Sequence, residues 1–182
     1  MTFEIDPVLT DALREEVVGL WTDVVNGGGA VGFVAPVVAG DVRPTAQAAL
    51  AAVDGGTDRM IAGFEGGRLV ALLFVAGNGH RLKEHWRTLK RVMVAPDRQR
   101  SGYGGAIMRE ATAVARTMGL DALQLTVRGG TGTEGFYARL GYREVGRVPG
   151  ALRVAPGDDR DEIVMWLDLR DQQAPRAKQH GG

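Results

Sequence analysis

Residues 92–105 read VMVAPDRQRSGYGG, and this stretch decides the fold of the 182-residue chain. An apolar run stops at Pro96, a turn rich in arginine and glycine follows, and an amphipathic segment begins at Gly104. The pattern predicts a strand, a turn and a helix in that order. The first N–H groups of such a helix lack intrahelical partners, and its dipole favours an anion. The stretch therefore predicts a phosphate or pyrophosphate site, although a plain strand-to-helix turn remains an alternative.

Two common phosphate motifs do not fit this stretch. The P-loop needs a Gly-Lys-Ser/Thr sequence, which is missing here. The dinucleotide fingerprint matches at Gly102 and Gly104, but its third glycine would fall on Ile107. The kind of phosphate ligand therefore has to come from the rest of the chain.

Hydrophobic periodicity and turn residues predict one mixed α/β domain around this stretch. The helices are expected at residues 6–24, with Asp6 as the cap, and at 44–53, 104–118 and 131–140. Thr131 and Glu134 match a capping box for the last of them. The strands are expected at residues 60–65, 68–76, 89–94, 122–127, 142–148 and 163–169. Residues 1–170 are predicted to be a single domain, and residues 171–182 a polar, disordered tail.

Composition excludes several classes of protein. The 22 basic and 22 acidic residues balance, which argues against a general nucleic-acid binder. Without cysteine there is no disulfide, thiolate zinc site or cysteine nucleophile. No apolar run approaches the roughly 18 residues of a membrane span, and no signal peptide is visible. We expect a cytoplasmic protein without a metal, membrane or nucleic-acid partner.

Two separated blocks of the sequence resemble the GNAT superfamily of N-acetyltransferases. Gln99, Gly102 and Gly104 follow a Val-x-Pro sequence and match the family's Gln-x-x-Gly-x-Gly motif. Residues 134–142, EGFYARLGY, resemble its Phe-Tyr-x-x-x-Gly-Phe/Tyr segment. Two motifs in the correct order are more specific than either one alone.

A narrower likeness concerns two loops. Residues 26–33, NGGGAVGF, and residues 146–150, GRVPG, resemble the tabtoxin-resistance branch, whose members acetylate a small amino-acid-like toxin. This likeness suggests a detoxification or antibiotic-resistance role without fixing the substrate.

The superfamily resemblance implies a fold, a cosubstrate and a set of contacts. The fold is an α/β (α+β) domain with a twisted, mostly antiparallel mixed sheet between helices, splayed between residues 89–94 and 122–127. The cosubstrate is acetyl-CoA, whose pantetheine arm lies along the strand before the turn. One N–H of that strand would stabilise the oxyanion. The implied cosubstrate contacts are Val92, Met93, Val94, Gln99, Arg100, Ser101, Gly102, Tyr103, Gly104 and Gly105.

Tyr137 matches the family tyrosine near the CoA sulfur and is the predicted catalytic residue. Its ordinary pKa near 10 exceeds that of a thiol near 8.5, so it would act mainly by hydrogen-bonding the leaving sulfur. A purely structural role beside Phe136 is the alternative. The general base is not identified, because residues 85–94 hold no carboxylate and Thr126 stands where one is expected. Water, or an acceptor that arrives deprotonated, would suffice.

Several other residues have a structural and a functional interpretation. Gly28, Gly29 and Phe33 are predicted to contact the acceptor, although the glycine run could be a hinge. Arg98 is interpreted as a surface charge, and His80 and His85 as part of a solvated loop. The three tryptophans Trp21, Trp86 and Trp166 are expected to pack.

The predicted reaction is acetyl transfer to a primary amine of a small molecule by direct attack. The rivals are a protein acetyltransferase and a non-catalytic acyl-CoA sensor. An acidic open groove would favour a protein acceptor, and a closed pocket near residues 27–33 a small one. A homodimer is left open as a partner.

Overall fold

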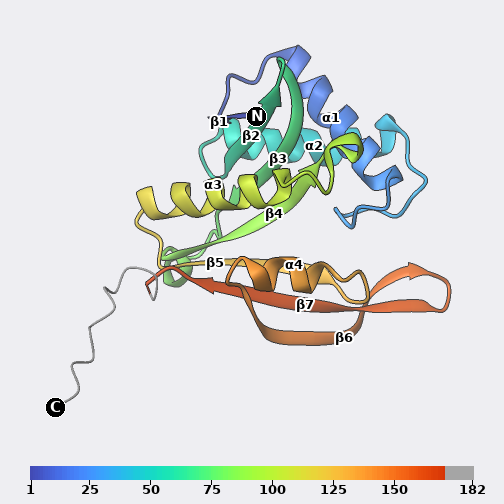
Figure 1. Ribbon diagram of the computed structural model, residues 1–182, viewed down its shortest axis with the longest axis vertical. Helices are drawn as coiled ribbons and strands as arrows, with labels where there is room; N and C mark the ends of the chain where they lie inside the picture. The colour runs from blue at the N-terminus through green and yellow to red at the C-terminus, as the bar shows by residue number, and fades with distance from the viewer. Residues whose placement is uncertain (171–182) are drawn as a thin grey trace.

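One twisted sheet organises residues 1–170, the part of the chain that the computed structural model describes (Figure 1). Its seven strands run in the order β1-β2-β3-β4-β5-β7-β6, and all neighbours are antiparallel except β4 and β5. The predicted fold class is confirmed, and the predicted tail lies outside the described residues. The strands are β1 (Thr2–Ile5), β2 (Arg59–Glu65), β3 (Arg68–Ala76), β4 (Trp86–Val94), β5 (Ala122–Arg128), β6 (Arg143–Ala155) and β7 (Asp158–Asp168).

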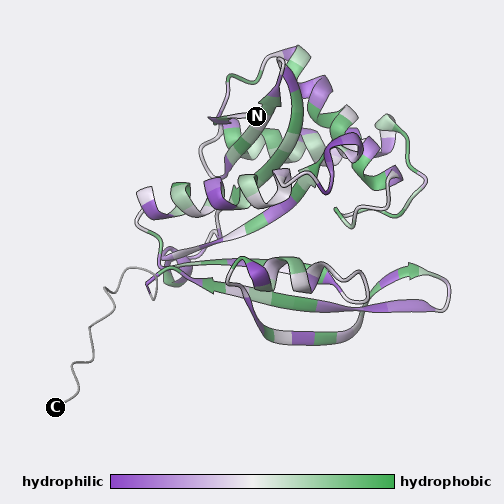
Figure 2. Ribbon diagram, in the orientation of Figure 1, coloured by the Kyte–Doolittle hydropathy of each residue, from purple (hydrophilic) through white to green (hydrophobic). Residues whose placement is uncertain are grey.

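Helices cover both faces of this sheet, and the strand side chains alternate between them. Leu72 and Phe74 of β3 pack in the core under α1 and α2, whereas Leu73 and Val75 pack in the core under α3. Figure 2 shows β3 coloured mainly as hydrophobic, as expected for a strand buried on both faces, whereas β4 also carries hydrophilic residues. We call the two sides the α1/α2 face and the α3/α4 face. The helices are α1 (Asp11–Asn26), α2 (Ala39–Asp54), α3 (Tyr103–Thr117) and α4 (Thr133–Arg139).

The N-terminal segment differs from the prediction. The first helix begins after Thr10, whose hydroxyl accepts a hydrogen bond from the Leu13 N–H at 3.2 Å. Asp6 is not a cap: it has φ 50°, forms an ion pair with Arg59 and accepts from the Met60 N–H at 2.8 Å. The strand β1 was missed because a single four-residue edge strand carries little periodicity.

The second helix also begins earlier than predicted. Proline is favoured at the first helical position, so Pro44 was interpreted as the start. In the structure Pro44 lies inside α2, and the helix begins at Ala39, where the Asp41 carboxylate accepts from the Val38 N–H at 2.9 Å.

The C-terminal strands form a hairpin that is longer than predicted. Pro149 and Gly150 indicated a loop, yet they lie within β6, which forms the edge of the sheet. An edge strand tolerates proline and irregular pairing, and the β6–β7 register shifts at this point. The predicted capping box at Thr131 is also wrong, because α4 follows Gly132 in a left-handed conformation without a side-chain cap.

Candidate active site

The strands β4 and β5 pair at one end and separate at the other (Figure 1). Their parallel register covers the pairs Trp86–Ala122, Arg87–Leu123 and Thr88–Gln124. Within the described residues, β4 and β5 form no further pair beyond Thr88–Gln124. There the Thr88 hydroxyl donates to the Gln124 side-chain carbonyl at 3.0 Å. The predicted splay is therefore present, and we use this word for the open region between residues 89–94 and 125–128.

The backbone of β4 is available on its open side. The Ala95 N–H donates to the Val70 carbonyl of β3 at 2.8 Å. Backbone groups of successive strand residues point in opposite directions, so the N–H groups of Val92 and Val94 face the splay. A ligand with amide groups could pair with them as an added strand would.

A cavity of about 1310 Å³ occupies the splay and extends past both strands. Sites for one drug-sized ligand are about 300–1,000 Å³, so this volume suits two ligands that meet. Its lining comes from the α1–α2 loop (residues 27–38), β4, the turn before α3, β5, α4 and the β6–β7 hairpin.

The N-terminus of α3 opens into this cavity. Gly102 precedes the helix with φ 87°, and a Cβ at this position would meet open space within 4 Å. The Gln99 side chain donates to the Val94 carbonyl at 3.1 Å, which ties the turn to the end of β4. The first N–H groups of α3 have no intrahelical partner. Together with the exposed Arg100, they are suited to hold an anion at the mouth of the cavity, and we call this group of donors the anion site.

Most of the predicted cosubstrate residues line the cavity, and three do not. Met93 packs in the core of the α1/α2 face, and the half-buried Tyr103 packs against the same core and donates its hydroxyl to Glu65. Ser101 donates to the Arg98 carbonyl within the turn. Arg98 forms an ion pair with Glu65, which agrees with its interpretation as a surface charge. The predicted residues that do line the cavity are Val92, Val94, Gln99, Arg100, Gly102, Gly104, Gly105, Tyr137, Gly28, Gly29 and Phe33.

Tyr137 lies on α4 at the wall of the cavity. Its ring makes edge contacts with Phe136, at a centroid distance of 5.0 Å, and with Tyr142, at 5.9 Å. Burial raises the pKa of Tyr137 to about 12. The hydroxyl therefore stays protonated near neutral pH and can donate a hydrogen bond, but it cannot serve as a base.

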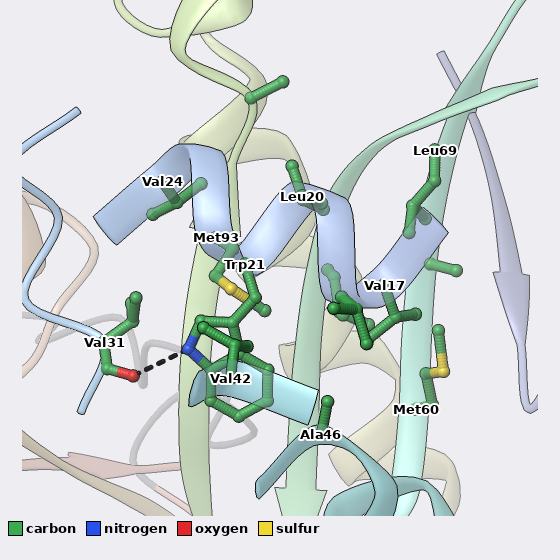
Figure 3. Close-up of a cluster of buried hydrophobic side chains, with 14 of the residues drawn as sticks. Val17, Leu20, Trp21, Val24, Val31, Val42, Ala46, Met60, Leu69 and Met93 are labelled. Atoms are coloured by element: carbon green, nitrogen blue, oxygen red, sulfur yellow. Dashed lines mark hydrogen bonds between the residues drawn. The ribbon is translucent and has the colours of Figure 1, made fainter. Parts of the chain in front are cut away.

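The α1–α2 loop forms the opposite wall and is fixed by Trp21 (Figure 3). The Trp21 Nε1–H donates to the Val31 carbonyl at 3.0 Å, and Phe33 packs edge-on against the indole at 6.2 Å. Gly28, Gly29 and Phe33 thus belong to a loop that is anchored to the core of the α1/α2 face. The hinge interpretation of the glycine run has no support in these contacts.

Besides Arg100, six charged residues line the cavity, and none of them was predicted as a site residue: Lys90, Arg91, Arg128, Arg139, Arg153 and Glu162. Arg91, Arg128 and Glu162 lie on β4, β5 and β7 and line the cavity. Val127 and Ile163 pack in the core of the α3/α4 face, so alternation places the neighbouring side chains of Arg128 and Glu162 on the α1/α2 side. The contact with the Trp21 ring places Arg91 on the same side. Alternation along residues 122–128 could have indicated Arg128. Predicting Glu162 would have required the register of the β6–β7 hairpin. Predicting Arg91 would have required the β-bulge in β4, which has no sequence signature.

The comparisons with known proteins agree with this geometry. Residues 39–142, more than half of the chain, match the model of the "Acetyltransferase (GNAT) family". The chain belongs to this family. The match contains the anion site and Tyr137, whereas α1 and the β6–β7 hairpin lie outside it. No curated protein sequence matches the chain.

Solved structures share the GNAT fold at low sequence identity. The ribosomal-protein-alanine N-acetyltransferase of Brucella melitensis is 15% identical with a TM-score of 0.73, covering 92% of this chain and 99% of that one. An aminoglycoside 6'-N-acetyltransferase complexed with coenzyme A is 14% identical (TM-score 0.72, 97% and 99%). The protein yncA of Salmonella typhimurium with its cofactor acetyl-CoA is 15% identical (TM-score 0.71, 97% and 99%).

Proposed function

We propose that this acetyltransferase moves the acetyl group of acetyl-CoA to a primary amine of a small molecule. The observation that carries the proposal is one continuous cavity that joins the anion site of α3 to the open backbone of β4 and to Tyr137. Acetyl-CoA requires these features, because it combines a pyrophosphate, an amide-containing arm and a thioester. The relatives with coenzyme A and acetyl-CoA support the same ligand.

The chain's own groups divide the work of binding. The N–H groups of residues 100–105 would hold the pyrophosphate, and Gly102 leaves space for it. The N–H groups of Val92 and Val94 would pair with the arm. Met93, Ser101 and Tyr103 have their side chains directed elsewhere, so they are proposed to contribute through the backbone at most.

Tyr137 is proposed to donate a hydrogen bond to the departing sulfur. Acetyl-CoA supplies the acetyl group as an activated thioester. A C–N bond forms while the C–S bond breaks, the amine loses a proton, and the sulfur gains one. With a pKa of about 12 for Tyr137 and about 8.5 for a thiol, full proton transfer to a finished thiolate would be uphill by about 5 kcal/mol. Stabilisation by the hydrogen bond is therefore the main role.

A small acceptor is favoured over a protein. The α1–α2 loop and residues 151–154 of β6 flank the acceptor side of the cavity. Among the described lining residues Glu162 is the only carboxylate, so the surface is not the acidic groove that suits a basic protein segment. The relative from Brucella melitensis is named for a protein acceptor, which keeps a protein acetyltransferase as the second candidate.

The narrower role in toxin or antibiotic resistance is a further proposal. Its support is the likeness of residues 26–33, most of which line the cavity, to the tabtoxin-resistance branch. Residues 146–150 carry the other half of the likeness, and they lie along the edge strand instead.

Calorimetric titration with acetyl-CoA tests the function, with Gly102→Glu as the variant. A carboxylate at residue 102 would repel the pyrophosphate, so saturable binding to the wild type should be lost. Gly119→Glu is the matched control, because Gly119 follows the other end of α3 with a similar φ of 70° and equally open space. Equal binding by both variants, or no binding by the folded wild type, would contradict the proposal. A screen of amines with thiol detection then distinguishes an enzyme from a sensor.

A further inference from the structure

Arg91 occupies an unusual position in the strand β4. Its φ of 55° falls where the β3–β4 register shifts, between the pairs Leu72–Met93 and Phe74–Lys90. One extra residue is therefore bulged out of β4 next to the splay. A left-handed conformation is uncommon for a residue with a Cβ, and such conformations concentrate at functional sites.

The Arg91 guanidinium is partly buried without an acidic partner. It lies over the Trp21 ring, with Cζ 5.3 Å from the ring centroid. A Cβ on Gly32 would come within 2.8 Å of Cζ, so the α1–α2 loop covers one side of the group. Within residues 1–170 no carboxylate forms an ion pair with it. Desolvation lowers the pKa of Arg91, although an arginine remains charged at neutral pH.

A second guanidinium converges on the same loop from the other side of the splay. Arg128 donates from Nη2 to the carbonyl of Phe33 at 3.4 Å, one residue after the glycine that Arg91 contacts. The Nε of Arg128 is buried and has no hydrogen-bond partner. A buried donor without a partner is costly, so Arg128 has a hydrogen-bonding group that the protein leaves unused, while Arg91 has a charge without an acidic partner.

We propose that Arg91 and Arg128 bind the carboxylate of the acceptor, so that the acceptor is an amino carboxylate. This inference rests on the proposed function. A guanidinium binds a carboxylate in a two-pronged geometry, and these two approach adjacent residues of one loop, Gly32 and Phe33, from β4 and β5. Glu162, directly opposite Arg128 in the β5–β7 register, adds the negative charge that suits the amino end of the same ligand.

Paired acceptors provide the test. Amino acids and their carboxamides differ only in the carboxylate, and O-phosphoethanolamine carries a phosphate instead. With acetyl-CoA and thiol detection, we expect kcat/KM for the best amino acid to exceed that for its amide by about 10- to 100-fold, as for a hydrogen bond to a charged group. Arg91→Gln should bring the ratio close to one by weakening only the amino acid. A preference for amides or for phosphoethanolamine, or acetylation of neither set, would overturn the inference.

Controls separate this inference from other causes of lost activity. Arg153→Gln removes a cavity cation that is already paired with Asp159 at 2.7 Å, and it should keep the preference. Arg91→Gly suits the left-handed backbone and serves if Arg91→Gln does not fold. Calorimetry with acetyl-CoA distinguishes the two failures. Normal binding without a carboxylate preference rejects this inference alone, whereas absent binding rejects the proposed function.

Discussion

The indole of Trp21 holds two parts of the acceptor side at once. Its Nε1–H donates to the Val31 carbonyl at 3.0 Å, while its ring lies 5.3 Å from the Arg91 guanidinium (Figure 3 shows the first contact). A cation over an indole face is stabilised by about 0.5–2 kcal/mol. One buried side chain therefore sets the position of both the α1–α2 loop and the bulged arginine.

Replacing Trp21 with phenylalanine should loosen the loop while keeping an aromatic ring. The Val31 carbonyl would lose its buried donor, which costs about 1–3 kcal/mol, and the smaller ring adds a cavity term. We expect a higher KM for the acceptor and an unchanged Kd for acetyl-CoA. Steady-state kinetics and calorimetry measure the two. Trp86→Phe, at the Trp86–Trp166 contact, is the control, and an equal rise in KM there would contradict a specific role for Trp21.

Tyr137→Phe tests the hydrogen bond to the departing sulfur. Because the hydroxyl is proposed to act in the transition state, kcat should fall by about 10²–10⁴ while acetyl-CoA still binds. Rapid mixing with thiol detection measures the rate, and calorimetry the binding. An unchanged kcat in the folded variant would leave Tyr137 as a core aromatic.

Tyr142→Phe should have the opposite profile. The Tyr142 hydroxyl is buried and has no hydrogen-bond partner, so removing it relieves a desolvation cost of about 1–3 kcal/mol. The free energy of unfolding should rise and kcat should stay within a factor of about two, since the residue does not line the cavity of the splay. Denaturant unfolding checks the first expectation. A clear loss of stability would mean that the hydroxyl has a partner, such as a water molecule.

The same two tyrosines predict how stability depends on alkaline pH. Burial raises the pKa of Tyr137 to about 12, and it raises that of Tyr142 as well. An unfolded tyrosine loses its proton near pH 10, so above this pH the unfolded chain binds fewer protons than the folded one. Stability is then complete below pH 10 and falls as the pH rises towards 12, by at most about 3 kcal/mol for Tyr137. Between pH 9 and 11.5, the free energy of unfolding should fall less steeply with pH for Tyr137→Phe than for the wild type. Equal slopes would show that Tyr137 titrates normally.

The sequence predicted the parts of the fold that depend on local chemistry. The Gly66-Gly67 hairpin is present with φ values of 58° and 82°, and Gly119 ends α3 in a left-handed conformation. Both follow from the freedom of glycine at single positions. The extent of β6 could not be predicted, because Pro149 and Gly150 are tolerated only on an edge strand, and edge position is a property of the whole sheet.

The residues of the candidate site also fall into those that local sequence indicates and those that depend on tertiary structure. The anion site and Tyr137 lie on motifs with fixed spacing, so the sequence indicated them. Arg91 and Glu162 reach the cavity through a β-bulge and through hairpin pairing with β5, which are tertiary effects. The sequence therefore indicates residues that lie on a family motif more readily than residues that tertiary structure brings to the cavity.

The short pairing between β4 and β5 also has a mechanical consequence. Three residue pairs join the strands, and beyond them the two halves of the sheet are connected by side-chain packing and by the hydrogen bond from Arg128 to the Phe33 carbonyl. A ligand that pairs with Val92 and Val94 would bridge this seam and add cohesion between the halves. Binding the cosubstrate would thus raise the melting temperature by mass action and slow amide hydrogen exchange in both β4 and β5. The protein would then be most stable in the state in which the cosubstrate is bound.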